Sequence, residues 1–303
     1  MKPITIAALI SLSLIWGASF LFIKVLLDFY NPFGIVFFRS LFGAITIFII
    51  MLLLKKPIIP KNLPWKMIIL IGILNSFIPW SLFGFSETSI SSGMASILNA
   101  TTPIWTLIMG ALFYSSKSTP LQWFGILLGF VGIFILLDID LNSLSINNTY
   151  GFIAAMLAPV FYGLSSHMTR RHLKELTNYQ TSFYLLLVTV FTSGLVVLFT
   201  GSFYWSYLVT EPYALLSLIG LGSFGSGIAF VIYFYLIYEK SAEFASLVTY
   251  LIPISAILWG MTILNEELHT SMLLGLVLIL LGVYISGRNK RKDILLAEVT
   301  EGN

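Results

Sequence analysis

Long apolar stretches, separated by short polar segments, follow one another along almost the whole chain. They occupy residues 4–27, 33–54, 65–86, 92–115, 120–138, 150–169, 180–200, 212–238, 244–265 and 270–287. A helix needs about 20 mostly apolar residues to cross a bilayer, and these stretches are close to that length. The segments between them are too short for a soluble catalytic or nucleotide-binding domain. The pattern predicts an all-α polytopic membrane protein with ten transmembrane helices.

The composition agrees with this pattern. Hydrophobic residues make up 58% of the chain and charged residues 10%, whereas about a quarter of the residues in a soluble domain are charged. The first apolar run is too long for a signal peptide, so we interpret it as the first membrane helix. The chain has no cysteine, which excludes disulfides and thiol chemistry.

One part of the chain is repeated. Residues 94–136 align without a gap on residues 244–286, a shift of 150. The identical pairs are Ala95/Ala245, Ser96/Ser246, Pro103/Pro253, Ile104/Ile254, Gly110/Gly260, Gly125/Gly275, Leu128/Leu278, Gly132/Gly282 and Ile135/Ile285. Earlier in each copy, at a shift of 146, Trp16-Gly17-Ala18-Ser19 matches Tyr162-Gly163-Leu164-Ser165, and Lys24 matches Arg170. We therefore expect two five-helix repeats, at residues 1–140 and 146–288, followed by a basic tail at 289–303.

The distribution of lysine and arginine predicts the orientation. With the N-terminus inside, every second loop is basic, and fourteen of the sixteen basic residues lie in or beside the inside loops and tails. The other two, Lys24 and Arg39, fall within the first and second helices. Basic loops stay on the cytoplasmic side, so both termini are expected to be cytoplasmic. Five helices carry the chain across the membrane, so the second repeat is inverted relative to the first. Inverted repeats are typical of transporters that work by alternating access.

Two matched prolines, Pro103 and Pro253, fall near the middle of the fourth and ninth helices. A proline inside a helix frees the carbonyl four residues earlier, and a freed carbonyl inside a membrane must face protein or water. The sequence therefore predicts helix kinks that line a cavity, with packing alone as the alternative. The candidate cavity residues are Trp16, Ser19, Asn99, Thr102, Tyr162, Ser165, Thr249 and Tyr250. The glycines of the eighth helix, from Gly220 to Gly227, indicate either an unwound or flexible segment that a substrate approaches or close helix packing.

Three ionisable residues near or inside the membrane are candidates for a functional charge. Arg39 either binds an anionic group or serves a structural role, pairing with Asp28 or reaching outward. Glu87, at the outer end of the third helix, and His167, near the inner end of the sixth, are the candidates for carrying a proton if transport is proton-coupled. No carboxylate falls at mid-membrane, so facilitated exchange is an equal alternative.

Several segments resemble a known family. They are SLIWGASFLFIK at 13–24, FFRSLFGAITIF at 37–48, ASILNATTPIWTLIMGALF at 95–113, and the stretch from Ala245 to Ile285. Together they resemble the EamA-type transporters of the drug/metabolite transporter superfamily. The resemblance implies a ten-helix inner-membrane protein with inverted repeats. Many members export amino acids and related metabolites. It also highlights Trp16, Gly17, Arg39, the two prolines and Glu266.

The expected function is that of a secondary-active or facilitative transporter that exports a small metabolite, such as an amino acid, across the cell membrane. A channel is an alternative, distinguished by flux that does not saturate. An intramembrane enzyme is disfavoured because clustered carboxylates or histidines are missing. We expect no cofactor, no metal and no nucleic-acid partner, since the basic residues are spread over alternate loops. The expected partners are the lipid bilayer and a small-molecule substrate, and the glycine-rich fifth and tenth helices leave a homodimer open.

Overall fold

The computed structural model of the chain describes residues 3–60, 62–116, 118–136, 149–201, 204–264 and 270–287. The tail at 289–303 and Glu266 lie outside the described residues. The described part is built from helices and their connections, without a strand. The all-helical class expected from the apolar pattern is thereby confirmed.

The first half of the chain contains the following helices, with a π-helical segment denoted η1: α1 (Pro3–Leu26), α2 (Pro32–Leu53), α3 (Trp65–Gly72), η1 (Ile73–Phe77), α4 (Ile78–Glu87), α5 (Ser92–Asn99), α6 (Thr102–Tyr114) and α7 (Pro120–Leu136). The second half contains α8 (Thr149–His172), α9 (Asn178–Thr200), α10 (Tyr207–Thr210), α11 (Pro212–Leu218), η4 (Ile219–Ile228), α12 (Ala229–Glu239), α13 (Ala242–Ser246), α14 (Val248–Leu264) and α15 (Thr270–Gly287). Apart from the short α10, the two halves have the same order of elements.

Among the described residues, seven helical stretches are long and apolar enough to cross a membrane. They are Pro3–Leu26, Pro32–Leu53, Trp65–Glu87, Met94–Tyr114, Thr149–His172, Asn178–Thr200 and Pro212–Glu239. Three further apolar helices are shorter in the described residues: Pro120–Ile135, Ala242–Ser255 and Leu274–Ser286. These stretches overlap the ten apolar segments of the sequence. In the part of the chain that the structure describes, seven of them reach spanning length, and the count of ten membrane helices stays a prediction.

Hydroxyl and amide side chains fix where several helices begin. Asn31 precedes α2, and its side chain accepts a hydrogen bond from the backbone N–H of Gly34 at 2.8 Å. Ser91 before α5 and Ser241 before α13 cap their helices in the same way, and these serines are 150 residues apart, the shift of the repeat. Such caps satisfy N–H groups that have no partner within the helix. The two halves therefore share helix-start signals as well as helix order.

Two long helices contain a π-helical segment at the same place. The segment η1 lies between α3 and α4, and η4 lies between α11 and α12. After η1 comes Pro79, which lacks a backbone N–H and so cannot continue a regular helix without a gap in its hydrogen bonds. In η4, the Ser226 hydroxyl donates to the Leu221 carbonyl at 3.0 Å. Segments of this kind often occur at functional sites.

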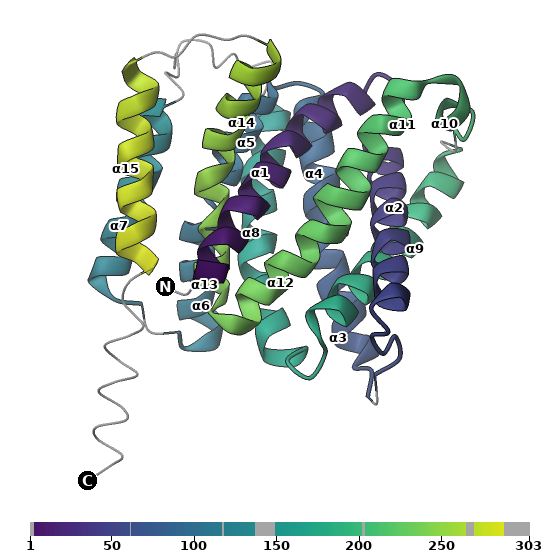
Figure 1. Cartoon of the computed structure of the whole chain (residues 1–303), viewed down its shortest axis with the longest axis horizontal. Helices are drawn as coiled ribbons and strands as arrows, with labels where there is room; N and C mark the ends of the chain where they lie inside the picture. The colour runs from purple at the N-terminus through teal and green to yellow at the C-terminus, as the bar shows by residue number, and fades with distance from the viewer. Residues whose placement is uncertain are drawn as a thin grey trace.

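The halves pack against each other reciprocally (Figure 1). Helix α1 packs on α14, as its counterpart α8 packs on α6. Likewise α2 packs on η4, and α9 packs on η1, while α7 and α15 lie side by side at one edge of the bundle. The start of α1 and the end of α15 lie at the same end of the molecule.

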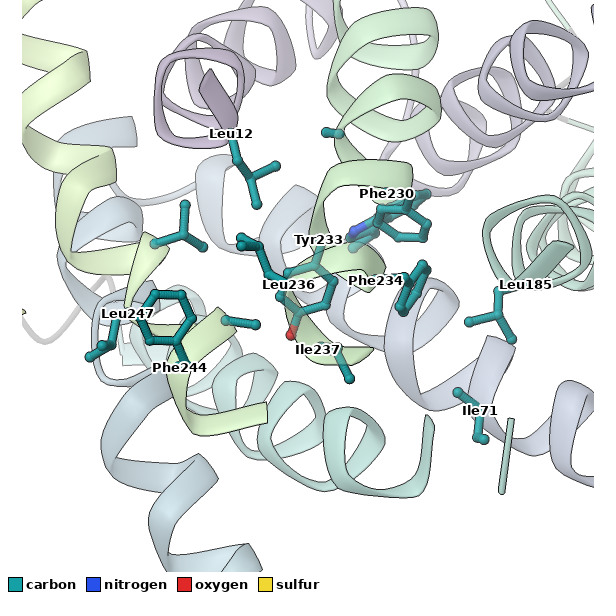
Figure 2. Packing of buried hydrophobic residues seen from close by; sticks show 14 of the residues in the cluster. Leu12, Ile71, Leu185, Phe230, Tyr233, Phe234, Leu236, Ile237, Phe244 and Leu247 are labelled. Atoms are coloured by element: carbon teal, nitrogen blue, oxygen red, sulfur yellow. The ribbon is translucent and has the colours of Figure 1, made fainter. Parts of the chain in front are cut away.

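Helix α12 supplies much of the buried centre (Figure 2). Its Phe230, Tyr233 and Phe234 are 5% exposed or less and lie among side chains from other helices, such as Leu12 of α1 and Leu185 of α9. Aromatic packing of this kind buries a large area for each residue. The interior between the two halves is therefore rich in aromatic side chains.

The glycines of η4 allow close contact with neighbouring helices. A Cβ atom added at Gly222 would lie 2.5 Å from Cβ of Phe42, and one added at Gly227 would lie 3.1 Å from the carbonyl oxygen of Gly43, both on α2. A Cβ added at Gly225 would meet the Ser19 hydroxyl of α1 at 2.9 Å. Of the two interpretations offered by the sequence, close helix packing is therefore the one that the structure supports.

Candidate functional site

A cavity with a volume of about 70 Å³ lies between the two halves of the chain. Its lining comes from helices of both halves and consists of Trp16, Ser19, Phe20, Ile23, Arg39, Asn75, Trp80, Phe83, Asn99, Thr102, Tyr162, Phe230, Tyr233, Ser246, Thr249 and Ile252. The lining combines aromatic rings with hydroxyl and amide groups and one guanidinium. Such a mixture suits a small ligand with an apolar body and a few polar atoms.

Most of the residues selected from the sequence meet at this cavity. Trp16, Ser19, Asn99, Thr102, Tyr162, Thr249 and Arg39 all belong to its lining. Trp16 donates from Nε1 to the carbonyl oxygen of Gly225 in η4 at 2.9 Å, and its ring centroid lies 5.2 Å from that of Tyr233. The indole is thereby held in place by the second half of the chain.

Ser165 and Tyr250 do not belong to the lining, which differs from the expectation. Ser165 is buried one layer behind it, where its hydroxyl donates to Oδ1 of the cavity residue Asn75 at 3.1 Å. The Tyr250 side chain turns away toward α7, and its hydroxyl donates to the carbonyl oxygen of Ile126 at 2.7 Å. Gly129 makes room for the ring, since a Cβ there would lie 2.8 Å from it. Tyr250 therefore joins two helices instead of facing the cavity.

The placement of Tyr250 gives a first prediction. Tyr250→Phe is expected to leave ligand binding in the cavity unchanged but to lower the free energy of unfolding by about 1 kcal/mol, because one buried hydrogen bond is lost. Thermal unfolding of the purified protein in detergent measures the second effect. A weakened ligand affinity at unchanged stability would contradict the assignment.

In each half, the membrane helix that contains the matched proline is interrupted before that proline. In the first half, α5 ends at Asn99 and α6 starts at Thr102, one residue before Pro103. In the second half, the break falls at Leu247, and Pro253 lies inside α14. The Asn99 carbonyl, which Pro103 deprives of its helical partner, accepts a hydrogen bond from the Thr102 hydroxyl at 2.5 Å. Both breaks adjoin cavity residues. The second break lies six residues before Pro253, so the kink predicted at that proline stays a prediction.

Arg39 faces the cavity and does not pair with Asp28 among the described residues. It is 5% exposed, its Nε donates to the Ser226 hydroxyl of η4 at 3.0 Å, and its guanidinium carbon lies 3.7 Å from the centroid of the Trp80 ring. A guanidinium on an aromatic face is stabilised by the ring quadrupole. The positive charge is thus fixed at the cavity wall by α2, α4 and η4.

His167 and Glu87 lie outside the cavity lining, near the ends of their helices. His167 Nε2 is 2.9 Å from the carbonyl oxygen of Thr106 and 3.8 Å from Oε1 of Glu243. It stacks on Tyr114 in a second pocket, which also contains Ser116, Arg170, Arg171 and Glu243. Glu87 is fully buried, and its Oε2 accepts a hydrogen bond from Ser92 at 2.7 Å. Neither side chain forms part of the cavity wall.

Two hydrogen bonds at matching places of the two halves, which we call the latches, each join a basic side chain to a carbonyl at the C-terminal end of a helix. In the first, Lys24 of α1 donates from Nζ to the carbonyl oxygen of Glu87, the last residue of α4, at 2.9 Å. In the second, Arg170 of α8 donates from Nη1 to the carbonyl oxygen of Lys240, the residue after α12, at 2.5 Å. Carbonyls at helix C-termini lack a helical partner and attract cations. The α1–α2 turn and the α12–α13 junction lie at opposite ends of the molecule (Figure 1).

The sequence-based selection missed several lining residues: Asn75, Trp80, Phe230, Tyr233 and Ser246. Asn75 carried a usable signal, because an amide in the middle of an apolar helix is costly in a membrane unless it has a role. The aromatic residues carried none, since most aromatic residues of membrane helices pack in the core or at the lipid interface.

Apolar helices packed around a central cavity with polar and aromatic walls form the arrangement of a multi-pass membrane transporter. The model of the EamA-like transporter family matches residues 3–138 and 149–288. The chain belongs to this family, within the drug/metabolite transporter superfamily, and the resemblance found in the sequence is confirmed.

Similar proteins carry transporter names. The chain is 21% identical to the uncharacterized transporter YoaV of Bacillus subtilis, covering 92% of this chain and 94% of the relative. It is 28% identical to the uncharacterized inner membrane transporter YedA of Escherichia coli, covering 92% and 91%. A solved crystal structure with 16% sequence identity superimposes with a TM-score of 0.78, covering 95% of this chain and 100% of the other, and shows that the two share a fold.

Proposed function

We propose that this protein exports a small metabolite by alternating access, as a facilitative or secondary-active carrier. Seven spans of full length and three shorter apolar helices would give ten membrane crossings. In this proposal the two halves are inverted repeats, both termini are cytoplasmic and the protein lies in the inner membrane.

The observation that carries the proposal is the pair of latches on either side of one cavity. Lys24 and Arg170 occupy equivalent positions of the repeat, and each binds the carbonyl end of an equivalent helix, α4 or α12. The cavity between them is lined by equivalent elements, such as α1 with α8 and α5 with α13. Opening one latch at a time would expose the cavity to one side and then to the other, as a carrier requires.

A cysteine in the cavity tests this directly, because the natural chain has no cysteine. We expect the thiol introduced by Ser19→Cys, which we call the reporter thiol, to react with a membrane-impermeant maleimide from either side of oriented vesicles. Lys56→Cys and Asp28→Cys, which replace exposed loop or helix-end residues, serve as markers of the inner and outer sides. Ser193→Cys, buried in α9 away from the cavity, is the unreactive control.

The same experiment separates a carrier from a channel. In a carrier, a variant held in one conformation makes the reporter thiol reactive from one side only. In a channel, the open conformation gives access from both sides at once. A variant that favours the open or the closed conformation therefore raises or lowers both labelling rates together. Labelling of the reporter thiol from one side only, in a chain that is natural at every other position, would contradict alternating access.

A further inference from the structure

Arg39 is the one charged side chain among the described residues that line the cavity. The rest of the lining is aromatic, aliphatic, hydroxyl or amide. A charge held in the interior of a membrane protein is costly, and such charges mark binding sites or ion pathways. What Arg39 binds therefore bears on the substrate.

The guanidinium is held in place with part of its hydrogen-bonding capacity unused. It has five N–H donors, and Nε uses one on Ser226, whose own hydroxyl proton goes to the Leu221 carbonyl. The Trp80 ring covers one face of the guanidinium at 3.7 Å. The structure gives its Nη nitrogens no hydrogen bond to the described residues. Such a fork matches the two oxygens of a carboxylate.

No carboxylate of the described residues neutralises Arg39 by contact. Glu87 interacts with it electrostatically but forms no ion pair with it within 4 Å. The Glu87 side chain is bound by Ser92 at 2.7 Å and does not belong to the cavity lining. A bound anion would therefore supply the counter-charge that the wall lacks.

The same lining, in the part of the chain that the structure describes, offers nothing anionic to a ligand's ammonium group. An amino acid would place its ammonium within two bonds of the carboxylate, close to the guanidinium, in surroundings that weaken charge repulsion little. A carboxylate that has an apolar body and no ammonium group avoids this repulsion. Its carboxylate group would contact the guanidinium, and its apolar body would contact rings such as Trp16, Phe83 and Phe230.

We propose that the preferred substrate is a small organic anion, a carboxylate with an apolar body and no α-ammonium group, whose head is bound by the Nη nitrogens of Arg39. This inference rests on the proposed transport function and names the substrate class of the same cavity. Among small metabolites, such a cavity would bind organic acids more tightly than zwitterions or amines.

Probes with nearly the same apolar body test the charge preference. They are 4-methylpentanoate, its permanently charged analogue 3-methylbutane-1-sulfonate, leucine as the zwitterion, and 3-methylbutylamine as the cation. Binding to the purified full chain in detergent is measured by quenching of tryptophan fluorescence, since Trp16 and Trp80 line the cavity. We expect both anions to bind, leucine to bind at least about tenfold more weakly, and the amine not to bind. Equal binding of leucine, binding of the amine, or failure of both anions would overturn the proposal.

Variants connect the preference to Arg39. Arg39→Gln is expected to abolish binding of both anions while retaining binding of the neutral 4-methylpentanamide, which shows that the cavity is intact. Arg39→Lys, which keeps the charge without the fork, is expected to weaken anion binding severalfold and provides a second test if the glutamine variant does not fold. Lys66→Gln, at an exposed position of α3, is the matched control. Unchanged anion binding in Arg39→Gln would exclude the site.

The labelling of the reporter thiol needs no ligand, so the two proposals fail separately. Labelling from both sides without anion binding would refute only the substrate class. Anion binding with labelling from one side alone would refute only the carrier mechanism.

Discussion

Replacing Lys24 by glutamine is expected to speed the labelling of the reporter thiol from the outside by about tenfold, and replacing Arg170 by glutamine is expected to do the same from the inside. Each substitution removes the charged donor of one latch. A hydrogen bond from a charged group contributes about 1.5–3 kcal/mol, and about 1.4 kcal/mol corresponds to a tenfold change in a conformational equilibrium. Labelling rates in oriented vesicles, measured from each side, give the effect.

The two variants are expected to speed labelling from opposite sides of the membrane, which distinguishes a latch from an interaction that only stabilises the fold. A protein that opens more often to one side opens less often to the other, so each variant should also slow labelling from the opposite side, where the other latch is intact. Lys24→Arg keeps a charged donor and is the conservative control. If both glutamine variants raised labelling from the same side, or only lowered thermal stability, the latches would not govern access.

Gly282→Ala is expected to destabilise the protein by about 1–3 kcal/mol, the usual cost of forcing an extra methyl group into a close-packed interior. The added Cβ would lie 2.5 Å from the carbonyl oxygen of Gly125 and 2.5 Å from the backbone nitrogen of Gly129, both on α7. Backbone atoms cannot rotate away as a flexible side chain can, so α15 would have to move off α7. Thermal unfolding in detergent measures the loss.

Gly194→Ala is the matched control, in the middle of α9. There the nearest atoms to an added Cβ belong to the Phe37 ring, at 3.3 Å, and a ring edge shifts more easily than a backbone. Alanine also favours the helix over glycine by up to about 1 kcal/mol. We therefore expect this variant to match or exceed the stability of the natural chain. Equal stability of the two alanine variants would show that α7 and α15 are not closely packed.

Much of the fold was predictable because the membrane restricts it so strongly. Chains in hydrocarbon must pair their backbone groups within the segment, so an apolar stretch such as 4–27 or 180–200 has little alternative to a helix. The repeat was visible because residues that restrict the backbone, such as Pro103 and Pro253, are identical in the two copies, whereas many of the residues around them differ. The π-helical segments η1 and η4 were not predicted, because apart from Pro79 they depend on contacts such as that of Trp16 with Gly225.

The sequence predicted where the candidate site lies more accurately than which residues line it. The repeat indicated the region around Asn99 and Thr249, and both residues line the cavity. Tyr250 was expected beside Thr249 but points away from the cavity, bonded to α7. A step of one residue turns a helix by about 100°, so neighbours in sequence rarely share a cavity.

Hydropathy and repeated residues are properties of the chain alone, and they were enough to predict a bundle of apolar helices, two related halves, and the equivalence of Lys24 and Arg170. Only the folded arrangement of the helices revealed what those equivalent residues bind and that Arg39 faces the cavity beside Trp80. It also revealed that the glycines of η4 pack on α2. The physical reason is that hydropathy sets which segments enter the membrane, whereas the direction of a side chain around its helix is set by packing against neighbours far away in sequence.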